Sequence, residues 1–275
     1  CRNSSPSSED RGLFSLIESK KTGIGFINTV EYTEEFNTYT YRNFYNGAGV
    51  GLADFNGDGL TDIYFCGNQA GNRMYINAGN FTFSDVTEAA GVKCEGSWST
   101  GVSIADVNGD NLPDLYVCKS GKPGRANQLF INNGNLTFTD KAREYGVDVM
   151  GLSNHATFFD YDRDGDLDLY LLNNSLESVT TFDTGPGQRN IPDPLGANRL
   201  FRNDGNRFAD VTNESGIFSS RIGFGLGVIA GDINRDGWPD LYVANDFFER
   251  DYLYLNNGNG TFSEILDDAM TETSL

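Results

Sequence analysis

Four short loops of the sequence concentrate acidic and amide side chains at alternate positions. The first loop runs from Asp54 to Asp62, and its copies begin at Asp106, Asp160 and Asp232. Each copy has Asp or Asn at positions 1, 3, 5 and 9, so its oxygens would repel one another without a cation. Ca²⁺ takes about six to eight oxygens in irregular geometry, whereas Mg²⁺ demands a regular octahedron. The spacing therefore predicts up to four calcium ions, one in each loop.

The expected ligands in each loop are the side-chain oxygens at positions 1, 3, 5 and 9, together with position 7, where a backbone carbonyl serves. They are Asp54, Asn56, Asp58, Leu60 and Asp62; Asp106, Asn108, Asp110, Leu112 and Asp114; Asp160, Asp162, Asp164, Asp166 and Asp168; and Asp232, Asn234, Asp236, Trp238 and Asp240.

Position 6 of each loop must turn sharply, and a positive φ is expected there. Gly59, Gly165 and Gly237 suit that conformation, and Asn111 is the next most tolerant residue type. An EF-hand is excluded because position 12 is apolar rather than Glu and lies inside a predicted strand. We expect the ions to pin the turns and to stabilise the fold, because they bind only the folded state.

The loops sit inside a longer repeat, and their starts are 52, 54 and 72 residues apart. A small apolar strand leads into each loop, an alternating strand leaves it, and two more short strands follow, separated by Gly/Asn-rich turns. Four strands per repeat without a helical spacer predict the four-stranded blades of an all-β propeller. The blades are expected at residues 46–92, 98–147, 152–217 and 222–275.

The stretch from Gly49 to Phe65, GVGLADFNGDGLTDIYF, resembles the FG-GAP/VCBS repeat of integrin-α-like propellers. The closer resemblance is to cartilage-acidic-protein-like propellers that occur as lipoproteins of Bacteroidetes. This resemblance covers residues 25–275. It implies seven blades, calcium in the blade loops, and binding of a ligand or partner rather than catalysis.

Residues 13–45 precede the first full repeat and are expected to contain one or two strands. Gly25–Asn28 resembles the fourth-strand pattern, so we assign it to the outer strand of a last blade, which closes the ring. Either four blades close the ring, or three further blades lie outside this sequence. The second alternative is preferred, so the four blades are expected to be part of a seven-bladed propeller.

The first residue is Cys1, and the polar, Ser-rich residues that follow it up to residue 12 are predicted to form a flexible tether. A chain that begins with Cys in this context resembles a mature bacterial lipoprotein. We therefore expect lipidation at Cys1, membrane attachment through that lipid alone, and an outer-membrane location. The cell-surface side is favoured over the periplasmic side.

Cys66, Cys94 and Cys118 form an odd set that fits no complete disulfide framework. Cys66 and Cys118 occupy equivalent places in adjacent repeats, and Cys94 lies between the repeats. Cys94 could bridge to either of them in an oxidising compartment. The alternative is three free, buried thiols.

The net charge of −19 excludes a binder of nucleic-acid backbones, which needs a basic patch to displace counterions. His155 is the only histidine, and it is expected to face the central channel as a packing residue. One histidine supports neither a multi-histidine zinc site nor a catalytic triad, and no phosphate-binding loop is present. An enzyme is therefore not expected.

Two segments are expected on the face opposite the acidic loops, where the second turns of the blades lie. Residues 174–196 form a long insertion in the third blade, which is either functional or a variable surface loop. Residues 245–250 add two aromatic side chains. The candidate partner contacts are Phe182, Arg189, Ile191, Phe247 and Phe248.

The leading hypothesis is a calcium-stabilised, lipid-anchored module for protein interaction, within an outer-membrane complex. The alternative is a surface adhesin or glycan receptor that uses the same face. A propeller enzyme acting on polysaccharide is weaker, because no acid/base pair can be assembled outside the metal loops.

Overall fold

The computed structural model describes residues 14–121, 126–175, 177, 187–247 and 249–270. Cys1, Phe182 and Phe248 lie outside these residues, as does the predicted tether. Within the described residues the chain folds into four antiparallel sheets of four strands each, in which consecutive strands pair in order. The predicted all-β architecture of four-stranded blades is confirmed.

Each blade is a simple meander followed by one short helix. Blade 1 contains β1 (Val50–Ala53), β2 (Asp62–Phe65), β3 (Arg73–Asn77), β4 (Phe83–Asp85) and α2 (Thr87–Ala90); blade 2 contains β5 (Ser99–Ala105), β6 (Asp114–Lys119), β7 (Gln128–Asn132), β8 (Phe138–Asp140) and α3 (Ala142–Tyr145). Blade 3 contains β9 (Ser153–Phe159), β10 (Asp168–Asn173), the 3₁₀ helix η1 (Gln188–Asn190), β11 (Arg199–Asn203), β12 (Phe208–Asp210) and α4 (Thr212–Ser215); blade 4 contains β13 (Gly225–Gly231), β14 (Asp240–Asn245), β15 (Tyr252–Asn256), β16 (Phe262–Glu264) and α5 (Leu266–Ala269).

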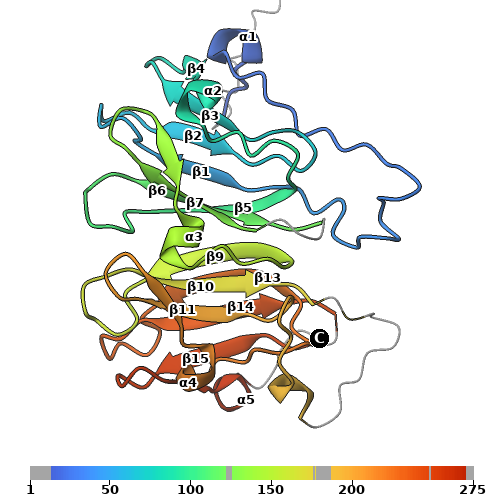
Figure 1. The fold of residues 1–275 in the computed structure, drawn as a ribbon, viewed down its shortest axis with the longest axis vertical. Coiled ribbons are helices and arrows are strands. Elements are labelled where there is room, and N and C mark those ends of the chain that lie inside the picture. The colour runs from blue at the N-terminus through green and yellow to red at the C-terminus, as the bar shows by residue number, and fades with distance from the viewer. Residues whose placement is uncertain (1–13, 122–125, 176, 178–186, 248, 271–275) are drawn as a thin grey trace, which may run out of the picture.

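The blades lie face to face in chain order, with blade 1 and blade 4 at opposite ends of the stack in Figure 1. Every residue of β6 and of β10 is buried, because each of these strands is covered by a neighbouring blade on both sides. This explains why the second strands read as nearly continuous apolar runs. The predicted total of seven blades stays a prediction.

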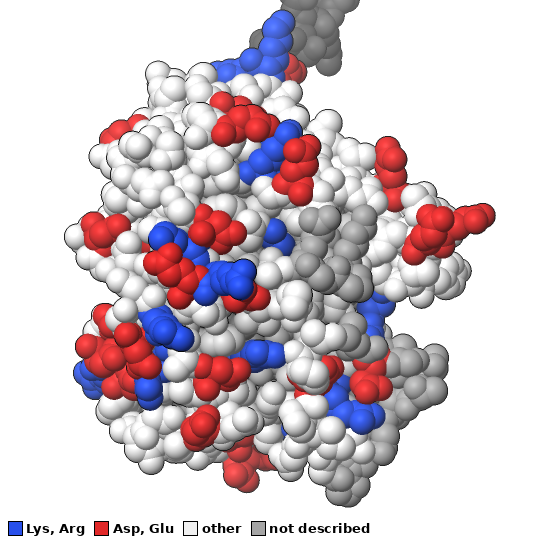
Figure 2. Space-filling view, viewed as in Figure 1, with Lys and Arg blue, Asp and Glu red and all other residues white. Residues whose placement is uncertain are grey.

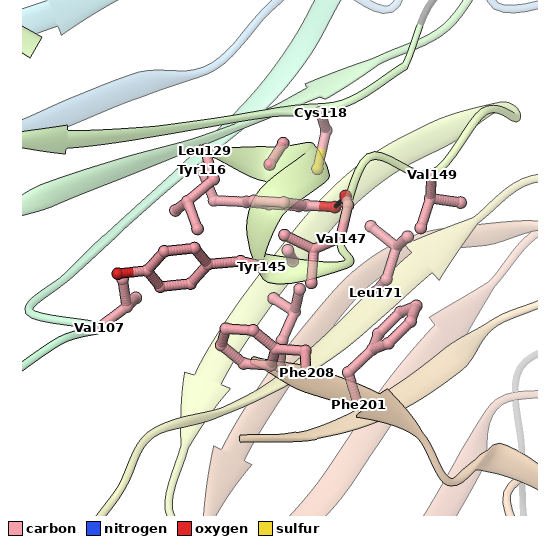
Figure 3. Close-up of a cluster of buried hydrophobic side chains, with 13 residues drawn as sticks. Val107, Tyr116, Cys118, Leu129, Tyr145, Val147, Val149, Leu171, Phe201 and Phe208 are labelled. Atoms are coloured by element: carbon pink, nitrogen blue, oxygen red, sulfur yellow. Dashed lines mark hydrogen bonds between the residues drawn. The ribbon is translucent and has the colours of Figure 1, made fainter. Parts of the chain in front are cut away.

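One apolar layer fills each interface between neighbouring blades. Figure 3 shows the layer between blades 2 and 3, where Tyr116 and Leu129 from one sheet meet Leu171 and Phe201 from the next. Equivalent layers join blade 1 to blade 2 and blade 3 to blade 4. Burial of these side chains is the main stabilising contribution to the stack.

The N-terminal segment corrects one prediction. Between residues 14 and 49, all of which are described, the only regular element is α1 (Ser19–Thr22), and Gly25–Asn28 forms no strand. Instead, Phe26 stacks on Phe65 with ring centroids 5.1 Å apart, and the Asn28 side chain accepts from the backbone N–H of Asn68. This segment binds blade 1 through side chains, so it is not part of a strand ladder.

Cys66, Cys94 and Cys118 are all free thiols, as the second alternative expected, but only Cys66 and Cys118 are buried, and Cys94 is partly exposed. Burial raises the pKa of the Cys66 and Cys118 thiols, so both remain protonated. None of the helices in the described residues has the length and apolar character needed to cross a membrane.

Candidate functional site

The aspartate at position 9 of each acidic loop is a buried junction between three parts of its blade. In blade 1, Asp62 accepts one hydrogen bond from the backbone N–H of Phe55 and another from that of Asn77, both at 2.8 Å. The same two bonds recur in the other blades at Asp114, Asp168 and Asp240, and all four carboxylates are at most 1% exposed. Position 9 therefore ties the loop and the second strand to the third strand.

The aspartate at position 1 organises the turn itself. Asp54 accepts from the backbone N–H groups of Gly57, Asp58 and Gly59 at 2.7–3.1 Å. At position 6 the backbone has positive φ in all four loops, at Gly59 (82°), Asn111 (65°), Gly165 (99°) and Gly237 (90°). The positive φ predicted for position 6 is confirmed.

Burial disfavours the charged forms of several carboxylates in the acidic loops, whereas backbone hydrogen bonds, above all that from Gly59, lower the pKa of Asp54. Burial raises the pKa of Asp114 to about 6 and that of Asp168 to about 7. Burial also raises the pKa of Asp162, and the neighbouring Asp164 adds to the effect. Figure 2 shows acidic side chains along the left edge of the molecule, where these loops lie. A cation bound here would relieve both effects.

The third loop is the one whose geometry fits a cation best. Oxygen atoms of Asp160, Asp162 and Asp168 lie within 4.8 Å of one another. The Oδ1 atom of Asp162 is buried and has no hydrogen-bond partner in the structure. An unpartnered, buried carboxylate oxygen facing other carboxylates matches the oxygen-rich coordination of Ca²⁺.

The other three loops replace Asp at position 3 with Asn, and that amide interacts within the loop. Asn56 donates from Nδ2 to Asp58 Oδ2 at 3.0 Å, and its Oδ1 accepts from the Asp58 backbone N–H. Asn108 and Asn234 make the same contacts with Asp110 and Asp236. In these loops the amide hydrogens offset part of the carboxylate charge, which the third loop cannot do.

An asparagine ends the third strand of every blade, and from blade 2 onward it reaches into the preceding blade. Asn132 donates from Nδ2 to the Phe55 carbonyl at 3.1 Å. Asn203 donates likewise to Val107 at 3.3 Å, and Asn256 to Tyr161 at 2.8 Å. The sequence shows these asparagines at repeated positions, but their role was not predicted. They fix the register between neighbouring blades.

The opposite face is organised by residues 30–47, which run across the blades at the right of Figure 1. Tyr41 and Phe44 are buried against Trp98, which precedes β5. The Tyr41 hydroxyl donates to Ser120 Oγ at 2.9 Å. Burial raises the pKa of Tyr41 to about 12, so the phenol stays protonated and remains a donor.

Arg42 extends the same segment to blades 3 and 4. Its Nη2 donates to the backbone carbonyls of Ser175 and Glu177, both at 2.7 Å. The guanidinium carbon lies 4.8 Å from the ring centroid of Phe224 and 5.6 Å from that of Phe247. Arg42 therefore clamps the N-terminal segment across the face, and sequence reasoning missed it because it belongs to no repeat.

Of the predicted partner contacts, Arg189 forms an ion pair within the chain. Its Nε donates to Glu249 at 2.5 Å, and the Glu249 side chain is 1% exposed. Ile191 is partly exposed, while its carbonyl accepts from the Arg221 backbone N–H. Phe247 is 40% exposed and packs edge-on against Phe224. Ile191 and Phe247 are therefore accessible to a partner, whereas the Arg189 side chain is engaged in an ion pair within the chain.

A hollow of about 400 Å³ opens where the first strands of the blades converge on this face. Thr100, Asn154 and Leu226 line it from β5, β9 and β13. The remaining lining residues come from two loops and are Tyr41, Asn43, Asn46, Gly47 and Asp246. The lining is mostly polar and uncharged.

His155 lies on β9 opposite Leu172, and burial lowers the pKa of its imidazole. A neutral, partly buried imidazole in this position agrees with a packing residue. Its predicted orientation toward the channel stays a prediction.

Comparisons with known proteins find the same kind of repeat in this chain. The family described as FG-GAP-like repeat matches residues 54–117, 119–171, 190–243 and 232–274. Cartilage acidic protein 1 of Xenopus tropicalis is 27% identical over 244 residues, covering 85% of this chain and 34% of that protein. The protein of the same name from Homo sapiens is 26% identical over 222 residues, covering 79% and 31%. The chain thus spans about a third of the length of these relatives.

Among solved structures, a Photorhabdus luminescens Tc holotoxin pore aligns with 78% of this chain and 9% of its own chain, at 19% identity and a TM-score of 0.32. That similarity is too low to support an argument. The repeat matches cover well over half of the sequence, and three of the four run from one blade into the second strand of the next. The chain belongs to the FG-GAP-like repeat family.

Proposed function

We propose that this chain is a calcium-stabilised propeller module that binds a protein partner through the face opposite its acidic loops. The observation that supports this most strongly is the set of exposed tyrosines on residues 30–47. Tyr39 is 93% exposed and Tyr45 is 67% exposed. Exposed aromatic side chains on a well-packed base are typical of binding surfaces, because they bury much area at low entropic cost.

The base beneath these tyrosines is rigid. Tyr45 packs edge-on against Phe44, with ring centroids 4.9 Å apart, and Phe44 is fully buried against Trp98. Arg42 holds the same segment against blades 3 and 4. A surface that is ordered before binding loses less conformational freedom when a partner docks.

Calcium is proposed as the structural ion of the acidic loops. The third loop supports this with its three converging carboxylates and the unpartnered Asp162 oxygen. The ion would neutralise the carboxylates of the loop. The residues proposed to hold it there are Asp160, Asp162, Asp164, Asp166 and Asp168.

A location at the cell envelope, with a lipid on Cys1 and an outer-membrane protein as partner, belongs to the same proposal. It rests on the sequence around Cys1 and on the resemblance to Bacteroidetes lipoproteins. The intact mass of the protein isolated from its source would test it. A mass without an attached diacylglyceryl group would contradict the lipid anchor.

The partner surface is tested by the double variant Tyr39→Ala/Tyr45→Ala. The matched control is Phe81→Ala, because Phe81 is 63% exposed in the β3–β4 turn on the acidic-loop face. When each protein is used to capture partners from envelope extracts, we expect the double variant to recover about one tenth of the wild-type amount of partner or less. The control should recover as much as wild type. Equal recovery by all three proteins would overturn the proposed surface.

A glycan is the second candidate ligand, favoured by the polar hollow at the convergence of the first strands. Its amide, hydroxyl and carboxylate groups suit the hydroxyls of a sugar. A glycan array separates the two candidates. Binding that is lost in Asp246→Ala and kept in Tyr39→Ala/Tyr45→Ala would favour the glycan.

A further inference from the structure

Residues 31–39, named the tyrosine loop, project at the right of the molecule in Figure 1. Tyr32 is 59% exposed and Tyr39 is 93% exposed. The loop contains no lysine or arginine, and its three glutamates are all exposed: Glu31, Glu34 and Glu35. It therefore combines open aromatic rings with negative charge that no residue of the loop offsets.

A buried asparagine holds the tyrosine loop in one shape. Asn37 is 4% exposed, and its Nδ2 donates to the backbone carbonyls of Thr33 and Glu34 at 2.9 and 3.0 Å. Its Oδ1 accepts from the backbone N–H of Tyr39 at 2.8 Å. These bonds join the two halves of the loop, so Glu34 and Tyr39 are presented from one ordered base.

Contacts with blades 1 and 2 anchor the tyrosine loop at two further points. Phe36 packs edge-on against Trp98, with ring centroids 4.9 Å apart. The Gln69 side chain accepts from the backbone N–H of Glu31 and donates to the carbonyl of the same residue. A surface that is ordered in this way loses little conformational freedom when a partner docks.

The glutamates of the tyrosine loop form no ion pair with any described residue. The arginines nearby are engaged, because Arg42 donates to two backbone carbonyls and Arg189 pairs with Glu249. Arg221 Nε lies 3.3 Å from Glu177 Oε1. Figure 2 shows acidic side chains on the projection at the right. The charge that this surface offers to a partner is therefore negative.

Exposed tyrosine rings beside carboxylates suit one kind of side chain. A guanidinium group can donate two parallel N–H groups to a carboxylate, and it can lie flat on an aromatic ring. The ammonium group of lysine lacks this planar fork. A ligand that carries carboxylate or phosphate groups would be repelled by the glutamates.

We propose that the tyrosine loop docks an arginine-bearing segment of a protein partner, whose guanidinium groups pack on Tyr32 and Tyr39 and pair with the glutamates between them. This inference rests on the proposed protein-binding function and names the chemistry of the partner. A second copy of this chain is not the expected occupant, because two chains of net charge −19 repel one another.

Random peptides displayed on phage test the proposal with the full chain as the target. They are selected on wild type and counter-selected on Tyr39→Ala, so the survivors are peptides that need this tyrosine. We expect the survivors to be enriched in arginine relative to the unselected library. Survivors without that enrichment, or the absence of any survivor, would overturn the proposal.

Synthetic copies of the selected peptides then measure what the glutamates contribute. Glu34→Gln/Glu35→Gln should bind these peptides at least about fivefold more weakly than wild type in fluorescence polarisation, because two exposed ion pairs are lost. The matched control is Glu214→Gln/Asp268→Asn, which removes the same charge from exposed positions on α4 and α5. The control should bind as wild type does, and equal binding by both variants would contradict pairing with the loop.

Two further measurements separate arginine recognition from a general attraction between charges. Peptides with lysine in place of arginine should bind at least about threefold more weakly, and equal binding would contradict the preference for arginine. Raising NaCl from about 0.1 M to about 1 M should weaken binding of the arginine peptides, because the Debye length falls from about 10 Å to about 3 Å.

The inference can fail while the proposed function stands. A partner captured from envelope extracts through Tyr39 and Tyr45 might bind Glu34→Gln/Glu35→Gln as well as wild type at both NaCl concentrations. That result would leave the proposed protein-binding surface intact and would overturn only its recognition of arginine.

Discussion

The two faces of the stack are built on different principles. On the acidic-loop face, the buried aspartate at position 9 makes the same pair of backbone hydrogen bonds in all four blades. On the opposite face, the clamp at Arg42 and the Arg189–Glu249 ion pair each occur once. Contacts that recur in every blade serve the scaffold, whereas those that occur once can be specialised for binding.

Within the acidic-loop face, the third loop differs from the other three loops in the charge that it concentrates. Asn56 and its counterparts let three loops offset their own charge, whereas the third loop has five carboxylates at alternate positions. If the acidic loops bind calcium as proposed, the third loop should depend on the ion more strongly than its neighbours do.

Calcium removal should have the largest effect, because it acts on all four loops at once. At about 100 times the dissociation constant, each bound ion stabilises the folded state by about 2.7 kcal/mol. Excess EGTA should therefore lower the melting temperature by at least about 10 °C in a thermal scan. Asp162→Ala should abolish more of this calcium-dependent shift than Asn56→Ala. A melting curve unchanged by EGTA would contradict the proposal that the acidic loops bind calcium.

The substitution Asp168→Ala should be the most damaging change within a single loop. It leaves the buried backbone N–H groups of Tyr161 and Asn203 without their acceptor, which should cost about 3–5 kcal/mol. Urea unfolding in EGTA separates this loss from any loss of ion binding. The control Asp166→Ala changes an exposed carboxylate and should cost less than about 1 kcal/mol. Similar losses of stability in both variants would contradict a structural role for the two hydrogen bonds that Asp168 accepts.

On the opposite face, Arg42→Ala should lower the free energy of unfolding by about 2–3 kcal/mol. The variant loses charge-assisted hydrogen bonds to two carbonyls and the contact with the Phe224 ring. Arg207→Ala, at an exposed arginine, should change stability by less than about 0.5 kcal/mol. Chemical denaturation measures the free energy of unfolding of both variants. An Arg42→Ala variant as stable as wild type would mean that the Arg42 contacts do not stabilise the fold.

The raised pKa of Asp168 predicts a smaller, pH-dependent effect in the metal-free protein. Its folded-state pKa of about 7 lies above the unfolded value of about 3.9, so this contribution to stability is complete at low pH and is lost as pH rises through 7. Between pH 8 and pH 5.5, wild type should gain about 2 kcal/mol relative to Asp168→Asn, which cannot titrate. Parallel stability curves for the two proteins would contradict the raised pKa.

The repeated features could be predicted from the sequence because their causes are local. The spacing of acidic residues fixes each loop, and Gly or Asn at position 6 permits the positive φ that the structure shows. The apolar runs of the second strands likewise report burial between two blades. Periodicity made each of these inferences independent of long-range contacts.

The contacts that occur once could not be predicted in this way. Arg42 meets Ser175 across 133 residues of sequence, and no repeat relates the two positions. The strand predicted at Gly25–Asn28 is wrong for a related reason, because Phe26 and Asn28 contact blade 1 through side chains that no repeat relates to their partners.

The asparagine that links each blade to its predecessor has a consequence for synthesis on the ribosome. Asn132 completes a bond to blade 1, and Asn203 and Asn256 do the same for blades 2 and 3. Chains emerge from the N-terminus at about 5–20 residues per second. Each blade therefore waits several seconds for the asparagine that secures it. During that interval a nascent blade has an uncovered apolar face, where a chaperone can bind.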